Sequence, residues 1–337
     1  MSAISSHSKR ILNYRRADSL MRCLGYAALI ASVTSCSSTV DSSTPPIVSY
    51  YDYQLADPQG KPIALNALPD ELLNADVLLV GEWHTHSAIH RFQTDLLKQL
   101  ISQQPRTVTV SMEQFSRDAQ QTLNQYLAGE IGEQVLIQQA GAWPNYPSDY
   151  RPLVELAKQK QLAVIASNAP KSIVRCIGQQ GLSYLDKLDS KQRTWLAEQI
   201  DTRDSPYKEK FIASTHHGNA HHGKTQQTQR QFSAQMAWDE TMADSIVSYL
   251  TQHPQSQIMH IAGKFHVEQG QGAKASILRR DANLDVVVVS PVTELTNSGS
   301  DYQLLVLAPP VRYVQRDNLI QAYQALTQRN DAHQCLP

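Results

Sequence analysis

The sequence predicts an α/β fold with a mostly parallel central sheet flanked by helices, and with a helical insertion that forms a cap. Short apolar runs typical of buried strands alternate with segments whose apolar residues recur at helical spacing. That alternation is typical of parallel strands joined by right-handed helical crossovers. Residues 170–250 are polar and mainly helical in pattern, which indicates an insertion between the third and fourth of these strands.

The first half of the folded region supplies three buried strands. Residues 50–64 have a hairpin pattern around the turn at 57–60, because Asp, Pro and Gly favour turns. A short helical connection at 65–73 leads into the first strand. The elements that follow are a strand at 77–80, a helix from Ser87, a strand at 107–112, helices at 118–127, 135–139 and 153–159, and a strand at 162–166.

The second half adds a long helix and three more strands. The helix covers 225–250 and ends the polar insertion. Apolar runs at 257–262 and 285–289 predict two further buried strands. We expect a last strand, at 302–307, to form an antiparallel edge of the sheet. Together with the first half, these elements make residues 50–337 a single α/β domain.

Residues 1–35 predict an export signal. Basic residues precede an apolar run from Cys23 to Val33, which is too short to span a membrane and suits the central region of a signal peptide. Met21 is an alternative start of the chain. The small residues before Cys36 resemble a bacterial lipobox, so we expect Cys36 to be acylated, with palmitate among its acyl chains, and to become the mature N-terminus. An ordinary cleaved signal beside an incidental cysteine is the alternative.

Residues 36–49 are rich in Ser, Thr and Pro and predict a flexible tether. The whole chain has 30 basic and 31 acidic residues. The signal carries more basic than acidic residues, so the mature chain is net acidic. It has no basic stripe with interleaved aromatics, and we therefore expect no binding of nucleic acid.

Two of the four cysteines are left for the folded region. Cys23 leaves with the signal and Cys36 takes the lipid, so Cys176 and Cys335 remain. An exported chain can oxidise its cysteines. We predict a disulfide that ties the C-terminal tail to the middle of the chain; two unrelated thiols are the alternative.

Polar side chains follow four of the predicted strands at the point where each strand ends. Because the carboxyl ends of parallel strands meet at one edge of a sheet, where ligands bind, we expect these side chains to be neighbours. Gly81-Glu82-Trp83-His84 and Gly263-Lys264-Phe265-His266 share the form Gly-x-x-His after an apolar strand. The residues expected at this edge are Glu82, His84, His86, Glu113, Asn168, Lys264 and His266.

This strand-end set suits either metal binding or acid–base chemistry. Two imidazoles with two carboxylates, His84, His266, Glu82 and Glu113, are plausible ligands for a divalent transition metal. The same set could supply a general base. His86 and His90 are four residues apart and share a helix face if the helix begins near His86, but no Glu follows His86, so we predict no zincin-type site.

Two other segments bear on ligand binding. The segment 143–152 holds three prolines and is expected to be irregular; it carries Trp143, Tyr146 and Tyr150, which offer apolar faces to a planar ligand and phenol oxygens to iron. A loop packed on the body by its aromatics is the alternative. The histidine doublets at 216–217 and 221–222 are compositional indications of metal or haem binding only.

These motifs resemble the ChaN-type haem-binding lipoprotein family, within a wider group that includes Tiki proteases and erythromycin-esterase-like proteins. The resemblance covers roughly residues 70 to 310 in the right order. The segments that carry it are Gly81–His84 with His90, Ser111–Gln114, Trp143–Pro152, Gln235–Ala243 and Ile261–Val267. The histidine-rich segment 216–223 departs from that pattern.

The resemblance implies a lipid-anchored haem-binding protein of bacterial iron acquisition rather than an enzyme. It implies a dimer enclosing two cofacial haems, with iron held by a tyrosine, Tyr150 first and Tyr146 second, and with histidine assistance from among His84, His90 and His266, beside Trp143. Ser37 after the lipidated cysteine favours the outer membrane, facing the periplasm, where a haem receptor would be the partner. The alternatives are a metal-dependent hydrolase of peptide or ester bonds using Glu82, His84, Glu113 and His266, and an interaction lipoprotein whose cluster is vestigial.

Overall fold

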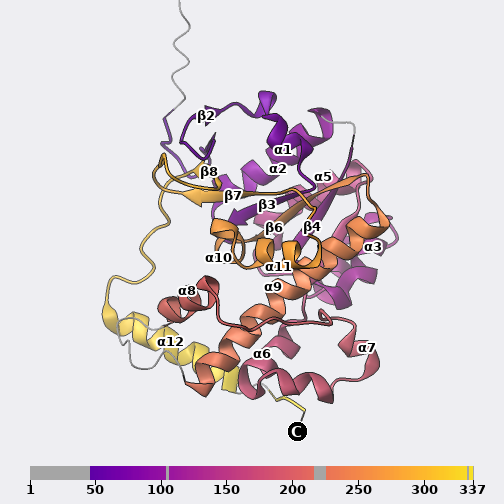
Figure 1. Cartoon of the computed structure of the whole chain (residues 1–337), viewed down its shortest axis with the longest axis vertical. Coiled ribbons are helices and arrows are strands. Elements are labelled where there is room, and N and C mark those ends of the chain that lie inside the picture. The colour runs from indigo at the N-terminus through magenta and orange to yellow at the C-terminus, as the bar shows by residue number, and fades with distance from the viewer. Residues whose placement is uncertain (1–45, 104–105, 216–224, 332–333, 337) are drawn as a thin grey trace, which may run out of the picture. The chain divides into compact units, whose positions relative to one another are not determined.

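A computed structural model of the protein describes residues 46–103, 106–215, 225–331 and 334–336. Residues 44–337 form one compact unit. At its centre is an eight-stranded sheet in the order β2-β1-β8-β7-β3-β6-β4-β5 (Figure 1). The predicted α/β class with a mostly parallel sheet is therefore confirmed.

The middle of the sheet is parallel and fully covered. Six consecutive strands of the sheet are parallel to one another: β8 (Tyr302–Leu305), β7 (Val286–Val292), β3 (Val77–Glu82), β6 (Ser256–Gly263), β4 (Thr107–Ser116) and β5 (Val164–Asn168). Near-continuous Val, Ile and Leu runs are typical of strands buried on both faces. β6 lies between β3 and β4, although it comes much later in the chain, so the chain returns to fill the centre of the sheet.

The antiparallel part of the sheet differs from the prediction. The expected hairpin is present as β1 (Gln54–Ala56) and β2 (Pro62–Ile63), closed by a hydrogen bond of 2.9 Å from the Gly60 amide to the Asp57 carbonyl. β8 was expected at the edge, and that expectation is wrong. β8 pairs parallel with β7 and antiparallel with β1, because the N-terminal hairpin covers its outer side.

Helices cover both faces of the sheet. Leu78 and Val80 pack with helices on one face, while Val77 and Leu79 pack with helices on the other, as the alternation along a strand requires. The first face carries α1 (Asp70–Asn74), α2 (Ser87–Gln103), α3 (Gln120–Leu127), α4 (Glu133–Gln139) and α5 (Arg151–Gln159). The second carries α9 (Gln226–Gln252), α10 (Lys264–Val267) and α11 (Ala273–Arg280).

The described part of the insertion is helical, as predicted. It contains α6 (Lys171–Gln180), α7 (Ser190–Arg193) and α8 (Pro206–Thr215). α6 packs against α9 through a small apolar core that includes Ile173, Ile177 and Ala237. Tyr207 of α8 packs on Phe232 and Met236 of α9. The insertion therefore rests on α9, which in turn lines the sheet.

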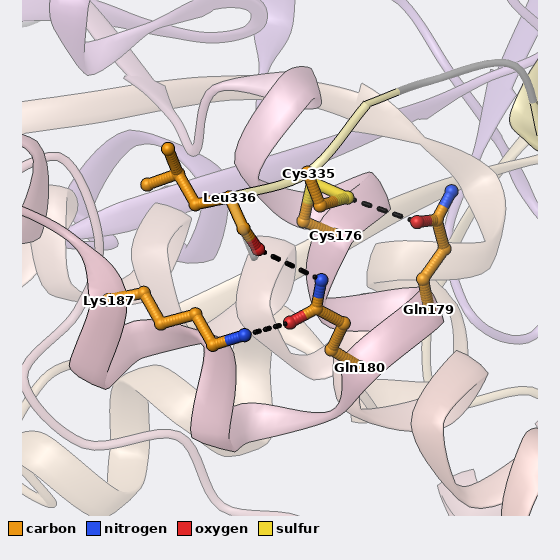
Figure 2. Close-up of a disulfide and its surroundings, with 6 residues drawn as sticks. All are labelled: Cys176, Gln179, Gln180, Lys187, Cys335 and Leu336. Carbon is orange, nitrogen blue, oxygen red and sulfur yellow. Dashed lines mark hydrogen bonds between the residues drawn. A yellow bond between two sulfur atoms is a disulfide. The ribbon is translucent and has the colours of Figure 1, made fainter.

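A C-terminal helix, α12 (Arg316–Asp331), follows the sheet and was not predicted. The disulfide between Cys176 and Cys335 is present, with a Cα–Cα distance of 5.6 Å, and fastens the end of the chain to α6 (Figure 2). Beside it, the Gln180 side-chain amide donates to the Leu336 carbonyl at 3.2 Å, and Lys187 donates to the Gln180 side-chain oxygen at 2.7 Å. The predicted disulfide between the C-terminal tail and the middle of the chain is confirmed.

Reducing this disulfide should lower the free energy of unfolding by about 2 kcal/mol, mainly by freeing the unfolded chain. We expect a value at the low end of the usual range because α12 itself is largely exposed. Urea denaturation of oxidised and reduced protein measures the difference, and Cys335→Ser should reproduce it. Identical midpoints for oxidised protein, reduced protein and the variant would contradict the expectation.

Among the described residues, no helix combines the length and apolarity needed to cross a bilayer.

Candidate functional site

The carboxyl ends of three neighbouring strands hold the predicted polar cluster. Glu82 ends β3, and the sheet register pairs it with Gly263, which ends β6. Glu113 lies in β4 on the other side of β6, where the pairing of β4 with β5 is shifted by an irregularity after Met112. The expectation that distant residues become neighbours is therefore confirmed for Glu82, His84, Glu113 and His266, whereas His86 lies outside the cluster.

Glu82 is the buried centre of the cluster. Its Oε1 accepts hydrogen bonds from the Tyr150 hydroxyl at 2.6 Å and from the Gln114 amide at 3.0 Å, and it lies 2.8 Å from His84 Nδ1. Its Oε2 accepts from Gln93 at 2.7 Å. Burial raises the pKa of this carboxyl, but the His84 hydrogen bond, the His90 charge and the Tyr150 hydroxyl outweigh it, so the pKa is lowered. Glu82 is thus a saturated carboxylate, in the sense that side chains of the protein engage both of its oxygens.

His84 is the exposed member of the cluster. Its side chain is 44% exposed, and Glu82 holds its Nδ1. The edge of the ring meets Trp143, with ring centroids 4.9 Å apart. Partial burial opposes its charge, but the Glu82 hydrogen bond and the negative charge of Glu113 raise the pKa of His84. The imidazole is therefore fixed by one carboxylate and faces a second.

Gly263 provides the space that His84 occupies. A Cβ atom at this position would lie 2.9 Å from His84 Cε1 and 3.1 Å from Nε2, which is closer than packed atoms tolerate. Glu113 accepts a 2.6 Å hydrogen bond from the Gly263 amide through Oε2. The glycine of the second Gly-x-x-His segment therefore allows the histidine of the first to lie against the strand end.

His266 is held by a hydrogen-bonded chain behind the cluster. Its Nδ1 lies 2.7 Å from Asp239 Oδ1, and its Nε2 lies 3.8 Å from Glu113 Oε1. The Tyr207 hydroxyl donates to Asp239 at 2.8 Å, so a residue of the insertion helix α8 holds the Asp239 carboxylate in place. Burial lowers the pKa of His266, but the charges of Asp239 and Glu113 outweigh it and raise the pKa to about 9. His266 is therefore a buried cation at neutral pH.

His90 lies inside the cluster rather than at its surface. It is 4% exposed, and its Nε2 donates to the His84 carbonyl at 3.0 Å while Nδ1 contacts Gln93 at the same distance. His86, four residues earlier, is elsewhere: its Nε2 donates to the Leu307 carbonyl at 2.9 Å. His90 thus shapes the backbone beneath His84, and His86 joins the first strand end to the C-terminal segment.

The aromatic loop is more regular and more buried than predicted. Tyr146–Tyr150 form one π-helical turn, and α5 begins at Arg151, because Pro147 and Pro152 lie in first-turn positions where the missing amide is tolerated. Tyr146 and Tyr150 are 1% and 0% exposed. Burial first, then the negative charge of Glu82, raise the pKa of Tyr150 far above its ordinary range, and burial raises that of Tyr146. The expectation that this loop presents phenol oxygens to a ligand is not met; Trp143 alone of the three is partly exposed.

The predicted metal set is not assembled as a metal site. In the part of the chain that the structure describes, no group of three or more His, Cys, Asp or Glu side chains has a geometry that could hold a metal ion. The physical reason is that Glu82 is saturated by side-chain donors, which turn both of its oxygens away from His266 and Glu113.

Four further residues complete the site and were not predicted as site residues. Asp239 and Gln235 orient His266, while Gln93 and Gln114 donate to Glu82. The sequence holds a usable indication for the first pair. Gln235 and Asp239 are four residues apart on a helix whose neighbouring face is apolar, so two polar side chains point inward together. Gln93 and Gln114 carry no such indication.

Three predictions concern residues that lie outside the described ones. These are the signal at 1–35, the lipidated Cys36, and the histidine doublets at 216–217 and 221–222. The tether prediction at 36–49 also falls mostly there. The described residues do not test them, so they remain predictions from the sequence.

The fold and the site together define a class: an α/β protein whose sheet carries a buried, saturated carboxylate and an exposed imidazole at its carboxyl edge. A family model described as "Haem-binding uptake, Tiki superfamily, ChaN" matches residues 68–277. The matched stretch is more than half of the chain and includes every residue of the cluster. The chain belongs to this family.

The solved structure of a ChaN protein shows the same fold. The ChaN protein of Campylobacter jejuni, described with cofacial haem binding, aligns over 78% of this chain and 100% of its own, with 20% identity and a TM-score of 0.60. An erythromycin esterase mutant in its open conformation aligns over 80% of this chain and 87% of its own, with 12% identity and a TM-score of 0.42.

One curated relative matches a shorter stretch. Protein RETICULATA-RELATED 5, chloroplastic, of Arabidopsis thaliana is 24% identical over 145 residues. The match covers 40% of this chain and 20% of that protein. The chain therefore spans only a small part of this relative's length.

Proposed function

We propose that this protein binds haem at the carboxyl edge of its sheet, beside His84 and Trp143. Membership of the haem-binding uptake family supports the ligand, and the geometry supports the place. The observation that carries the proposal is that His84 is an exposed imidazole held by a buried carboxylate, Glu82, at the edge where α/β sheets bind ligands.

The contacts of His84 suit a haem ligand. Glu82 fixes Nδ1, and a carboxylate in that position orients an imidazole and makes its other nitrogen a better ligand. Trp143 packs perpendicular to the His84 ring and is itself partly exposed, so it offers apolar surface to a porphyrin. We assign contact with haem to these two side chains, with Nε2 of His84 as the first candidate for iron.

Tyrosine ligation, which the family resemblance implies, needs a rearrangement here. Tyr150 would have to release Glu82, leave the core and lose a proton that its surroundings hold strongly. We therefore give Tyr150 the role of holding Glu82, and keep Tyr150 and Tyr146 as the alternative iron ligands. His90 and His266 do not contact the haem in this proposal. His90 supports the backbone of His84 through its carbonyl, and His266 faces Glu113.

The cellular setting is a further part of the proposal. A lipid on Cys36 would anchor the chain to the outer membrane, facing the periplasm, and a homodimer would enclose the haems. An outer-membrane haem receptor would be the partner in iron acquisition. The lipobox, the tether composition and the family membership support this setting.

The metal-dependent hydrolase is less well supported than haem binding. It requires Glu82, His84, Glu113 and His266 to hold a metal ion, yet the described residues form no such group, and the two carboxylates are engaged by Tyr150 and by the Gly263 amide. Metal analysis and ester or peptide hydrolysis by the purified chain would test it directly.

Titration with ferric haem tests the proposal. We expect the protein to develop a shifted Soret band, and His84→Ala to weaken binding at least about tenfold, or roughly 1.4 kcal/mol, through loss of a direct contact. His253→Ala is the matched control, because His253 is an exposed histidine on the far end of α9. Alanine at all four histidines of 216–217 and 221–222 should leave the band in place.

Three results of this titration would change the assignment. If His84→Ala binds haem as the unaltered protein does, the proposed site is wrong. If Tyr150→Phe alone abolishes the band while remaining folded, the iron ligand is Tyr150. If only the alanine variant of the histidine doublets loses the band, haem binds there instead.

Gly263→Ala should weaken haem binding without unfolding the protein. The new methyl group would collide with the His84 ring and displace it from Glu113. The exposed ring can move, so we expect the thermal midpoint to fall only slightly while the haem dissociation constant rises about tenfold. Gly178→Ala is the control, since a Cβ there meets its nearest neighbour at an ordinary 3.6 Å. Equal haem affinities for the two variants would contradict the role given to the Gly263 gap.

A further inference from the structure

Exposed large apolar side chains gather in two terminal segments. Among the described residues, those with more than a third of their area exposed lie in residues 48–51 and 311–336. Val314 is 83% exposed, Val311 77% and Val48 73%. Isolated exposed apolar residues are common, but their confinement to two short segments indicates a surface with a partner.

The first segment contacts the chain just before the second one, beside the candidate site. The Tyr50 hydroxyl donates to the Ala308 carbonyl, and the Tyr50 ring lies 4.9 Å from the His86 ring. His86 in turn donates to Leu307 and lies 5.9 Å from Trp83, the residue before His84. We call the exposed residues Val48, Tyr51, Val311, Tyr313 and Val314 the terminal surface. Its N-terminal part adjoins the carboxyl edge of the sheet through Tyr50 and His86.

We propose that the terminal surface docks on the lipid surface of the membrane that would anchor the chain. The inference rests on the lipid anchor of the proposed function. Pro46 is ten positions after Cys36, so a lipidated Cys36 would hold the start of the fold within roughly 35 Å of the bilayer. The apolar residues that follow, Val48 and Tyr51, are those nearest to that anchor in the chain.

The chemistry of the terminal surface suits a bilayer interface. Tyrosine is enriched at membrane–water interfaces, where its ring is apolar and its hydroxyl is wet. Arg91, Arg312 and Arg316 are exposed around the surface, and Arg91 donates to the Tyr51 carbonyl at 3.2 Å. Basic residues next to apolar ones are attracted by anionic lipids. Asp317 opposes them, whereas Asp52 is engaged by the amides of Val48 and Ser49.

The chain is held just before Val311 and again at its C-terminal end. The Tyr50 and His86 hydrogen bonds hold residues 307–308, and beyond α12 the disulfide holds Cys335 on α6 (Figure 2). Docking would therefore place the neighbouring His84 edge close to lipid, where an amphipathic planar ligand such as haem partitions. The terminal surface thus sets the orientation of the site relative to the bilayer.

A spin label at Val314→Cys tests the docking. The full lipidated protein is reconstituted in vesicles of phosphatidylethanolamine and phosphatidylglycerol, with the disulfide verified by mass spectrometry. We expect the label to be protected from a water-soluble relaxation agent and exposed to oxygen. A label at Lys160→Cys, an exposed site at the opposite edge of the sheet, should show no such protection. Val311→Ser with Arg312→Ser should remove the protection at 314.

Each outcome has a defined meaning. Equal accessibility of the labels at 314 and 160 overturns the proposal, as does failure of the protein to remain with vesicles because it carries no lipid. Protection that appears in detergent and rises with protein concentration shows a second copy as the occupant and also overturns it. A haem titration of the same samples keeps the two proposals apart, since docking without a Soret band refutes only haem binding.

Discussion

Replacing Glu82 by alanine should lower the free energy of unfolding by about 3–5 kcal/mol, the cost of removing one partner from a buried charged network. Glu82 is 2% exposed and accepts from Tyr150, Gln93 and Gln114, which would lose their acceptor together. Urea denaturation followed by circular dichroism measures the change. Glu130→Ala, at an exposed acid, should stay within about 0.5 kcal/mol of the unaltered protein.

The effect of Glu82→Ala should depend on pH in a defined direction. The pKa of Glu82 is lowered in the folded protein, so its stabilising contribution is present above the unfolded pKa and is lost as the pH falls through the folded pKa. The difference between the unaltered protein and the variant should therefore shrink in acid. A change smaller than about 1 kcal/mol at neutral pH would show that Glu82 is not the centre of the cluster.

The sheet was predictable because buried parallel strands leave a strong pattern. The runs at 77–80, 107–112 and 257–262 are apolar on both faces, and each became a strand with the expected direction. Their order along the sheet was not predictable, since nothing local places β6 between β3 and β4. The predicted position of β8 was wrong for the same reason: only the tertiary pairing with β1 decides which strand lies at the edge of the sheet.

The members of the site were predictable where a strand end fixes them. Glu82, His84, Glu113 and His266 lie at the same edge because parallel strands share their polarity. The directions of their side chains were not predictable. Tyr150 points inward because its hydroxyl donates a hydrogen bond to the buried Glu82 carboxylate. A short proline-rich segment has no periodicity from which the direction of this side chain could be predicted.

His266 should make the protein less stable as the pH rises from about 6.5 to about 9. Its pKa is raised from 6.5 to about 9 in the folded state, so its contribution is fully present below the unfolded pKa and is lost as the pH passes through the folded pKa. The shift corresponds to a contribution on the order of 3 kcal/mol. His266→Gln should flatten this part of the stability profile, while His253→Gln should leave it unchanged.

The same variant separates two roles for the cluster. If His266 is a buried cation held by Asp239, then Asp239→Asn should also flatten the profile, and nuclear magnetic resonance should show the His266 ring titrating well above an ordinary histidine. An undiminished slope in both variants would mean that His266 is neutral, and a neutral imidazole facing Glu113 at 3.8 Å is what a metal site requires. The protonation of this one ring thus decides whether His266 stabilises the cluster as a cation between Asp239 and Glu113 or only as a neutral hydrogen-bonding group.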